Sequence, residues 1–489
     1  MSNKRFHKHL TLLMAVFGGL YSIISIVNHY NFRTYALDLG LYTNALYKYS
    51  HFSLADSIMI KQISEPLLGG HFDIYLILLC PLSFIFGSYT LLIIQILAIL
   101  LGGLGVFNLM YKKHPDQPWI HLGAALYFYT FFAVLSALSY DYHSVVVAAC
   151  VVPWFFYTIH IKKYLSSFFL LILVVISQEN TSLWMAFVCL GLAIEYRSDL
   201  RTLTALLASS CFCLIYFFIV IKYAIPHFSV TEAYSGFLYS ALGSNPMEAT
   251  ATLVTHPIDS LRILFTNHIN HPNGDFVKIE FHLFVLLAGG YLLLKKPAYL
   301  VMLIPIYVQK LFHDNYGMWS ISGQYVIEFA PILAIGTFSV LGQVKNGVLK
   351  NALLLLLFAG SFGTSLRMMD NPDSHVNKSR IRFYQKQHYV RKYSTNLVHT
   401  QLNLIPRKAK VSAQSPFVPH LSLRENIYQF PIIKDADYII YSEKEGAYPI
   451  SSLKFEQLIQ DLRNSKEWKV YFENQDLTIL VKSNFFGPS

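Results

Sequence analysis

The chain has 489 residues, of which 54% are hydrophobic and only 13% are charged, and its mean hydropathy is +0.42. This composition excludes an ordinary soluble globular enzyme and is typical of a helical protein with several membrane spans. The net charge is +10, but the lysines and arginines lie in short clusters between apolar runs. Such clusters orient membrane helices, so they argue against a nucleic-acid partner.

The first apolar run, residues 10–28, follows the basic start KRFHK, and no small-residue cleavage site comes after it. It is predicted to be an uncleaved membrane span rather than a signal peptide. A crossing needs roughly 20 apolar residues. The further candidate spans are 89–111, 119–138, 144–161, 164–178, 181–195, 202–224, 281–294, 298–312, 324–342 and 348–366. The expected fold is therefore all-α, with about eleven crossings in a transmembrane domain over residues 1–370.

One short run, residues 71–87, contains Pro81 and is predicted to lie along the outer interface as an amphipathic or re-entrant segment. The basic links then fall on the same side of the membrane as the N-terminus. These links contain Lys112 with Lys113, Lys162 with Lys163, Arg197 with Arg201, Lys295 with Lys296, and Lys345 with Lys350. The positive-inside rule predicts a cytoplasmic N-terminus and an extracytoplasmic C-terminus, in the inner or plasma membrane.

This topology places most of the interesting ionisable side chains at the external surface. They are Asp38, His71, Asp73, Asp141, His143, Glu179, His313 and Asp314. An ionisable residue at the end of a span costs little, so its position alone does not indicate a function. Several acids and histidines on one face of an apolar protein are nonetheless typical of a site at the membrane–water boundary.

Asp38 lies in TYALDLGLYTNALY, residues 34–47, just after the first span. It is either a functional acid or a solvated carboxylate that caps a juxtamembrane helix. In SYDYHS, residues 139–144, Asp141 and His143 suit acid–base work or a metal, but they also suit a helix N-cap and a snorkelling imidazole. Glu179 lies in the short turn SQENTS, where it either hydrates a hairpin or meets a partner below the headgroups.

Two later segments carry further candidates for substrate binding. The long link 225–280 contains Arg262 and is either a lid over a site or a partly ordered connector. The segment 310–331 contains Lys310, His313, Gln324 and Tyr325. Its aromatic residues are typical of a membrane belt, whereas Lys310 and His313 also suit the binding of an anionic headgroup.

The composition changes after the last span, and a separate domain is predicted over residues 371–489. A basic amphipathic lead-in, KSRIRFYQKQHYVRK, comes first. AKVSAQ and ADYIIYS are then predicted as strands, SSLKFEQLIQDLRNS as a helix and WKVYFENQDLTILVKS as a hairpin. The result is a small extracytoplasmic α/β domain with no phosphate-binding loop and no zinc motif.

Taken together, the chain resembles the GT-C superfamily of integral membrane glycosyltransferases. This superfamily includes protein O-mannosyltransferases and the aminoarabinose transferase of lipid A. Among its relatives the closest likeness is to a large prokaryotic family of uncharacterised membrane proteins. The likeness covers nearly the whole chain and depends on the order and spacing of six segments. They are LDLGLYTNALY (37–47), GGHFDIYLILLCPL (69–82), SYDYHS (139–144), QEN (178–180), VSAQSPFVPHLSLRENIYQFP (411–431) and DADYIIYS (435–442).

The resemblance implies juxtamembrane helices in the first external loop and an essential acid soon after the first span, which Asp38 matches. It implies a second acid near the outer end of a later span, which Asp141 matches. It also implies a polyprenyl-phosphate sugar as donor and inversion at the anomeric carbon. Two segments depart from the family pattern: HFDI stands where HFSP is usual, and YHS stands where FHP is usual. Paired DxD acids are missing, so a need for Mg²⁺ or Mn²⁺ is not decided by the sequence.

The resulting hypothesis is a membrane glycosyltransferase of cell-envelope assembly whose acceptor is a lipid, a glycan or a protein. Asp38, Asp141 and Glu179 are its predicted catalytic residues. The predicted substrate-binding residues are His71, His143, Arg262, Lys310, His313, Gln324 and Tyr325. A transporter or lipid flippase is the main alternative, and it would favour ionisable groups near span centres and duplicated halves. A non-enzymatic envelope protein is the second alternative.

Overall fold

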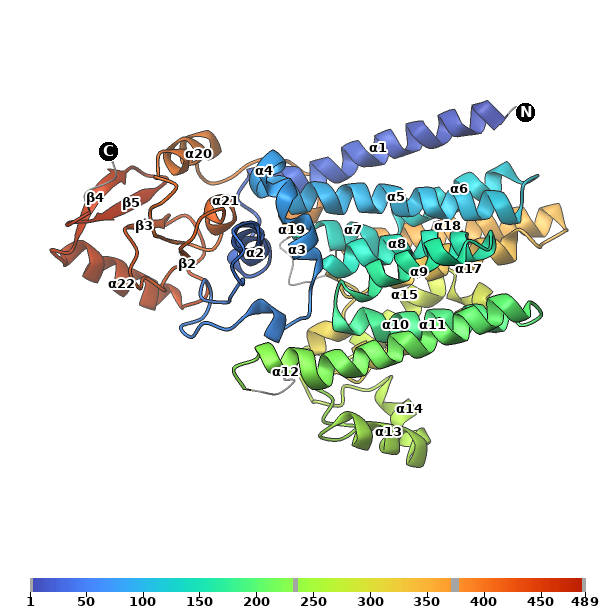
Figure 1. Cartoon of the computed structure of the whole chain (residues 1–489). Helices are drawn as coiled ribbons and strands as arrows, with labels where there is room; N and C mark the ends of the chain where they lie inside the picture. Colours follow the sequence, from blue (N-terminus) through green and yellow to red (C-terminus); the bar gives the residue numbers. More distant parts are fainter. Residues whose placement is uncertain (1–2, 232–235, 371–377, 486–489) are drawn as a thin grey trace. The chain divides into compact units, whose positions relative to one another are not determined.

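The computed structural model describes residues 3–231, 236–370 and 378–485. The chain forms two compact units, and each is assembled from separate pieces of sequence. The first unit contains Met1–Ser22, Leu68–Asp73 and Ile94–Ile381. The second contains Ile23–Leu67, Ile74–Ile93 and Arg382–Ser489. Figure 1 shows both units, coloured along the sequence.

The first unit is helical. It contains α1 (Asn3–Tyr30) in part, most of α5 (Thr90–Lys113), and then α6 (Pro118–Thr130), α7 (Phe132–Leu138), α8 (Ser144–His160), α9 (Tyr164–Val175), α10 (Glu179–Glu195), α11 (Leu200–Ile219), α12 (Ile225–Phe228), α13 (Pro246–Thr255), α14 (Pro257–Ile263), α15 (Val277–Leu287), α16 (Pro297–Leu311), α17 (Phe329–Leu341), α18 (Gly347–Asp370) and α19 (Lys378–Ile381). Apolar runs fold as helices because a helix satisfies its own backbone hydrogen bonds. A proline begins α6, α13, α14 and α16, where its missing N–H costs nothing.

Helix α10 packs against both α11 and α16. Figure 1 shows α10 and α11 side by side. The contact with α16 is close because Gly191 has no side chain. A Cβ atom built on Gly191 would lie 2.5 Å from the carbonyl oxygen of Ala298. Any larger residue at this position would force the two helices apart.

The helices support the prediction of a membrane protein, but they do not confirm eleven crossings. Within the described residues, four helical runs are long and apolar enough to cross a membrane: Lys8–Tyr30, Tyr75–Lys113, Leu200–Phe228 and Gly347–Asp370. A fifth candidate is the pair Pro118–Thr130 and Phe132–Leu138, which is bent by 42°. The other apolar helices have 10–17 residues. A helix of that length is at most about 25 Å long, shorter than a typical hydrocarbon core.

The run predicted to lie along the interface, residues 71–87, is a series of short pieces that leads into α5. It becomes helical at Tyr75, with α3 (Tyr75–Leu79), a 3₁₀ turn that contains Pro81, and α4 (Ser83–Phe86). Gly87 then has φ of 58°, a left-handed conformation that suits glycine, before α5 begins at Thr90. The proline and the glycine explain why no single straight helix forms here.

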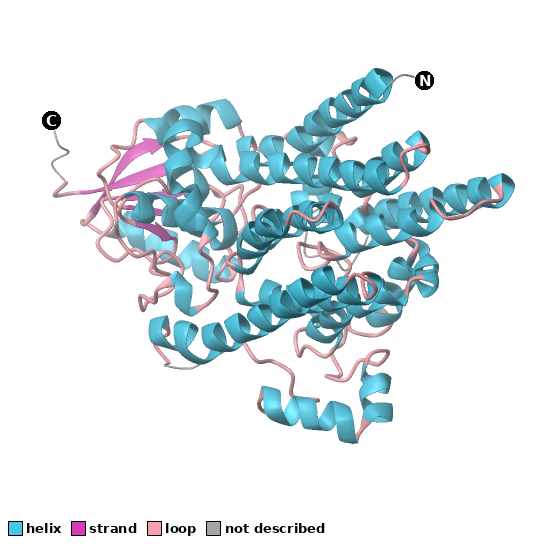
Figure 2. Ribbon diagram, turned by 45° about the vertical axis from the view of Figure 1, so that its right-hand side comes forward, coloured by secondary structure: helices cyan, strands magenta, loops and turns pink. Residues whose placement is uncertain are grey.

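The second unit is built around a mixed sheet, whose strands are magenta in Figure 2. In the described part of the chain this sheet has five strands in the order β2-β1-β3-β5-β4. They are β1 (Val411–Ala413), β2 (Ile427–Gln429), β3 (Tyr438–Tyr441), β4 (Trp468–Glu473) and β5 (Thr478–Lys482). β1 is parallel to β2 and β3, whereas β3–β5 and β5–β4 are antiparallel. The unit's helices are α2 (Leu41–Ser50), α3, α4, α20 (Thr395–Asn403), α21 (Val418–Leu421) and α22 (Ser452–Asn464).

Alternate residues of the strands contact two different hydrophobic clusters, one on each face of the sheet. Ile439 and Leu480 belong to a cluster with Phe455 and Ile459 of α22. Ile440 and its neighbours on the other face belong to a cluster that also contains residues of the first long loop. These loop residues are Phe32, Ala36, Leu41 and Met59. The first loop therefore completes the core on one face of the C-terminal sheet.

Polar contacts fix the first loop in the same place. The backbone N–H of Ala36 donates to Oγ of Ser415 at 3.2 Å. The side-chain amide of Asn44 donates to the carbonyl oxygens of Ser422 at 2.9 Å and Arg424 at 2.8 Å. The packing thus joins the first loop to the C-terminal part, whereas the predicted division into 1–370 and 371–489 separates them. That predicted boundary borders residues 371–377, which lie outside the described residues.

Candidate functional site

The turn between α7 and α8 presents Asp141 in a strained conformation. Asp141 has φ of 51°, in the left-handed region that a non-glycine residue rarely adopts. The buried amide of Gln95 on α5 holds this turn from both sides. Its Nε2 donates to the carbonyl oxygen of Asp141 at 2.9 Å, and its Oε1 accepts from the N–H of His143 at 3.0 Å. The strain is therefore sustained by hydrogen bonds that fix where the Asp141 carboxylate points.

The partner of that carboxylate comes from far along the chain. Nη2 of Arg380, on the short helix α19, donates to Oδ1 of Asp141. The side chains of both residues are almost completely buried, with exposed fractions of 7% and 2%. The guanidinium also lies over the ring of Tyr140, 5.7 Å from its centroid. Because a buried charge needs a partner, Arg380 is the reason that an ionised Asp141 can be buried here.

Glu179 is the first residue of α10, where the helix dipole favours a negative charge. Its carboxylate is buried and accepts two hydrogen bonds from the segment that precedes α3. Nδ1 of His71 donates to Oε1 at 2.9 Å, and the N–H of Phe72 donates to Oε2 at 3.2 Å. Burial raises the pKa of Glu179, but His71 and these N–H groups outweigh it, so this pKa is below its usual value. Burial alone would lower the pKa of His71. The Glu179 carboxylate outweighs this effect, so the pKa of His71 is above its usual value.

This ion pair makes the stability of the fold depend on pH. The contribution of His71 is present below its unfolded-state pKa and is lost as the pH rises through its raised folded-state pKa. The contribution of Glu179 is present above its unfolded-state pKa and is lost as the pH falls through its lowered one. The pair therefore stabilises most between the ordinary values of 4.5 and 6.5. We expect about 1 kcal/mol or less, since the imidazole is half-exposed and solvent screens it.

The measurement is the melting temperature of the wild type and of His71→Gln in detergent. The wild type should exceed the variant most at about pH 5.5, and the difference should shrink towards about pH 8.5. A matched control is His51→Gln, since His51 is exposed and contacts only its own helix and the adjacent residue. An equal difference at both pH values for His71→Gln would show that the pair is not ionised.

The same short segment also contacts the start of α8. Oδ2 of Asp73 accepts a hydrogen bond from Oγ of Ser144 at 2.5 Å. Oγ of Ser144 in turn lies 3.1 Å from the hydroxyl of Tyr142. Residues 71–73 therefore bridge the first residue of α10 and the first residue of α8. This arrangement gathers the carboxylates of Asp73, Asp141 and Glu179 in one region of the first unit.

A second group of predicted residues lies next to this cluster. Lys310, near the end of α16, is buried, and its Nζ lies 5.4 Å from the centroid of the Tyr325 ring. Gly323 separates Tyr325 from Tyr140: a Cβ on Gly323 would lie 3.6 Å from Cδ2 of Tyr325 and 3.8 Å from Cε2 of Tyr140. These are ordinary van der Waals distances, so it is the backbone, with φ of 82° at Gly323, that favours glycine here. Two aromatic rings thus connect Lys310 to the Arg380–Asp141 pair.

The remaining predicted residues have different surroundings. Gln324 is buried, and within the described residues its Oε1 has no hydrogen-bond partner. Nδ1 of His313 accepts from the N–H of Asn315 at 2.9 Å, so any ring proton is on Nε2. Burial lowers the pKa of His313, and at neutral pH this residue offers an N–H donor rather than a positive charge. Arg262 is exposed on α14.

Asp38 belongs to the second unit, where it lies in a π-helical turn, Ala36–Gly40, that leads into α2. Its side chain is half-buried, while the neighbouring Ala36 and Leu39 are fully buried. The turn is thus anchored on both sides of Asp38. That Asp38 meets Asp141 and Glu179 stays a prediction.

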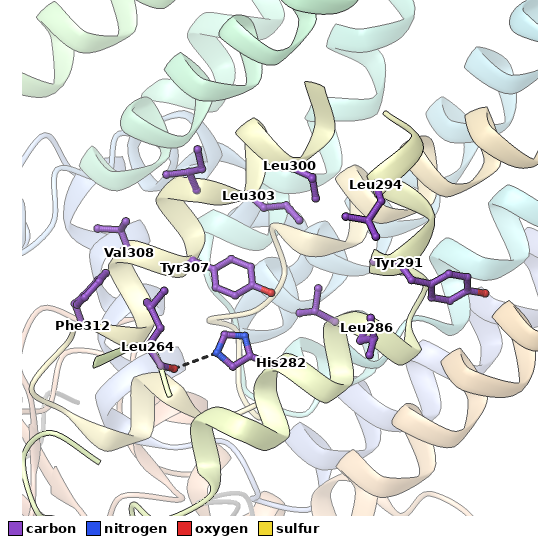
Figure 3. Close-up of a pocket in the computed structure, with 13 residues that line it drawn as sticks. Leu264, His282, Leu286, Tyr291, Leu294, Leu300, Leu303, Tyr307, Val308 and Phe312 are labelled. Atoms are coloured by element: carbon purple, nitrogen blue, oxygen red, sulfur yellow. Dashed lines mark hydrogen bonds between the residues drawn. The ribbon is translucent and has the colours of Figure 1, made fainter. Parts of the chain in front are cut away.

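The first unit also contains an apolar cavity of about 410 Å³ between α15 and α16. Figure 3 shows the side chains around it, with the ring of His282 directed towards the carbonyl oxygen of Leu264, to which it lies at 3.0 Å. Almost all lining side chains are aliphatic or aromatic. They are Leu264, His282, Val285, Leu286, Tyr291, Leu294, Leu300, Leu303, Ile304, Tyr307, Val308 and Phe312. Such a lining suits a hydrocarbon chain rather than a polar ligand.

Sequence patterns did not single out three of the residues that build the acidic cluster. Arg380 lies in a lead-in with many cations, and only its burial distinguishes it. Gln95 lies inside the apolar run of α5, where an isolated buried amide is a signal of a polar partner. Ser144 is the last residue of SYDYHS, and a serine at the start of an apolar run is typical of a helix cap. Among the described residues, no group of three or more His, Cys, Asp or Glu side chains is arranged to hold a metal ion.

Comparison with known proteins gives one family. The family model described as "Predicted membrane protein (DUF2079)" matches residues 28–479, which is most of the chain. Among curated proteins, none matches the chain. The matched region includes the acidic cluster, the apolar cavity and the C-terminal sheet up to the start of β5.

Proposed function

The chain belongs to the DUF2079 family of predicted membrane proteins, and from this premise we propose that it is a membrane glycosyltransferase of the GT-C type. Its donor is a polyprenyl-phosphate sugar, and its acceptor is a hydroxyl group of a lipid, glycan or protein at the extracytoplasmic face. The observation that carries the proposal is the gathering of Asp73, Asp141 and Glu179 around the starts of α8 and α10. An acidic cluster at helix starts and an apolar cavity in the same unit suit a substrate with a polar sugar and a hydrocarbon tail.

The proposed reaction is an inverting displacement at the anomeric carbon. The acceptor oxygen forms the new bond to this carbon while the bond to the phosphate oxygen breaks, and the electron pair stays on the leaving prenyl phosphate. The acceptor proton goes to the carboxylate of Asp38 as general base. Asp141 and Glu179 suit a different role, because Arg380 and His71 already stabilise them as anions. They orient sugar hydroxyls and stabilise the positive charge that develops on the sugar ring.

The leaving phosphate needs positive charge, and Lys310 is the favoured candidate to supply it. It is buried next to the aromatic rings that lead to Asp141, so its ammonium group acts where water does not screen it. Arg262 is the second candidate cation. His313 contributes a neutral N–H donor from its Nε2 atom. The prenyl chain then lies in the cavity between α15 and α16, whose lining is almost wholly apolar.

The test uses the purified full chain in detergent with radiolabelled prenyl-phosphate sugars and a panel of acceptors extracted from membranes. We expect label to move to an acceptor and free prenyl phosphate to be released in equal amount. The anomeric configuration of the product, read by NMR, should be opposite to that of the donor. Transfer from nucleotide sugars instead would overturn the lipid donor. Movement of the prenyl lipid across vesicles with no sugar transfer would favour a flippase.

A further inference from the structure

A second cavity, of about 280 Å³, lies in the first unit at the opposite ends of the same helices. Helices α5, α8 and α10 end at Lys113, His160 and Glu195, which all line it. Lys296, the residue before α16, lines it too. Since the acidic cluster lies at the first residues of α8 and α10, the length of these helices separates the two sites. One molecule in liquid water occupies about 30 Å³. The cavity therefore has room for a ligand much larger than one water molecule.

The lining of this cavity carries an excess of positive charge. Three lysines line it, Lys112, Lys113 and Lys296, together with a single carboxylate, Glu195. Nζ of Lys296 donates to Oε1 of Glu195 at 2.5 Å, so this carboxylate already has a partner. Lys112 and Lys113 add two more cationic side chains to the lining. Charges that share a partly enclosed cavity raise the local concentration of an anion.

The neighbouring histidines support the same conclusion. Burial and the positive charges around it, first among them Lys113, lower the pKa of His114 to about 4. Burial is the larger cause, and the lysines add to it, so His114 is neutral at neutral pH. Nδ1 of His160 lies 2.9 Å from the hydroxyl of Tyr196, which fixes this ring in the wall of the cavity. Neutral imidazoles offer N–H donors, which supplement the ammonium groups.

Helix capping accounts for only part of this arrangement. Lysines near a helix C-terminus interact favourably with the helix dipole, and this explains Lys112 and Lys113 at the end of α5. It does not explain Lys296, which lies at the N-terminal end of α16, where the dipole disfavours a cation. The N-terminal end of α16 itself adds positive potential to the cavity. Cations that converge from several helix ends around an open volume are typical of an anion site.

We propose that this cavity binds a phosphate group, with Lys112, Lys113 and Lys296 as its cationic ligands. The group comes from a soluble phosphorylated molecule or from the headgroup of an anionic lipid. The inference does not depend on the proposed function or on the orientation in the membrane, because it uses only the lining of this cavity. If the chain did not transfer sugar, the phosphate site would be unaffected. If this cavity did not bind phosphate, the proposed function would be unaffected.

The experiment measures binding to the full-length protein in a zwitterionic detergent by the rise in melting temperature. One arm titrates inorganic phosphate against chloride at equal ionic strength. The other arm titrates phosphatidylglycerol against phosphatidylcholine in mixed micelles. Saturable stabilisation by inorganic phosphate identifies a soluble source, whereas stabilisation by phosphatidylglycerol alone identifies a lipid headgroup. No stabilisation by either probe would overturn the proposal.

Two matched double variants assign the binding to the cavity. Lys112→Gln with Lys113→Gln should weaken binding at least tenfold, since it removes two of the three cationic hydrogen-bond donors of the site. Lys295→Gln with Lys345→Gln removes two exposed charges outside the cavity and should change binding less than about twofold. Equal weakening by both would overturn the site and leave only a general charge effect.

A measurement on the wild type guards against a variant that does not fold. Acetylation of lysines by a water-soluble reagent, read by mass spectrometry, reports which amines the bound probe covers. Saturating probe should slow the modification of Lys112, Lys113 and Lys296 and leave Lys295 and Lys345 unchanged. Unchanged rates at the three cavity lysines would contradict the proposal.

Discussion

Replacing Asp38 by Asn should lower the rate of sugar transfer by about 10²–10⁴-fold and leave the melting temperature nearly unchanged. The rate falls because the amide cannot accept the proton of the attacking hydroxyl. The fold is kept because the side chain is half-buried in a single turn, Ala36–Gly40, whose anchors are its buried neighbours. The measurement is transfer of radiolabelled sugar at saturating donor, together with a thermal melt of each protein.

The control is Asp461→Asn, which makes the same chemical change on the exposed side of α22 in the same unit. It should leave both the rate and the melting temperature unchanged. Raising the pH should not restore transfer by Asp38→Asn, because an amide has no proton to lose in the accessible range. Full transfer by this variant would remove Asp38 from the mechanism and leave the proton to another group.

Replacing Arg380 by Met should lower the free energy of unfolding by about 3–5 kcal/mol, because it leaves the carboxylate of Asp141 buried without its charged partner. The strained turn around Asp141 increases the effect. Without the guanidinium, the hydrogen bonds with Gln95 still hold the Asp141 backbone in its left-handed conformation. The Asp141 carboxylate, however, has lost the charged donor Arg380. Transfer activity should also fall, since Asp141 can no longer stay ionised in place. The measurement is thermal or denaturant unfolding in detergent, combined with the transfer assay.

A double-mutant cycle separates these two effects. Adding Asp141→Asn to Arg380→Met removes the buried negative charge that Arg380 balances and should recover most of the lost stability, while transfer stays low. Arg197→Met, which removes an exposed arginine after α10, should cost less than about 0.5 kcal/mol. If the Arg380→Met variant proved as stable as the wild type, the buried Arg380–Asp141 pair would contribute nothing to the free energy of unfolding. If the double variant transferred sugar normally, Asp141 would have no part in the reaction.

Local patterns predicted the C-terminal elements well, and they failed where pairing depends on distant residues. The amphipathic period of SSLKFEQLIQDLRNS predicts α22, and the alternation in WKVYFENQDLTILVKS predicts the β4–β5 hairpin. β2 has only three residues, Ile427–Gln429, and no period shows in so short a run. Its parallel pairing with β1 is invisible to local reasoning. The predicted number of membrane spans was not confirmed, because hydropathy does not show where an apolar run breaks into shorter helices.

The candidate site was predictable to the extent that it depends on helix ends. Asp141 and Glu179 precede apolar runs, so their position at the starts of α8 and α10 follows from the sequence. Arg380 could not be found in this way, because its segment offers several cations and only tertiary packing buries one of them. The same is true of Gly323: that it lies within van der Waals reach of both Tyr140 and Tyr325 depends on two loops far apart in the chain.

The composite core of the second unit has a consequence for how the chain must be made. Ala36 and the residue that it bonds to, Ser415, are 379 positions apart. At roughly 5–20 residues per second, a ribosome needs about 20–75 s to travel from one to the other. During that time the apolar face of the first loop has no strands to cover it. A nascent chain therefore exposes this apolar surface until the strands between residues 411 and 482 have been made, and a chain that stops before residue 411 keeps it exposed.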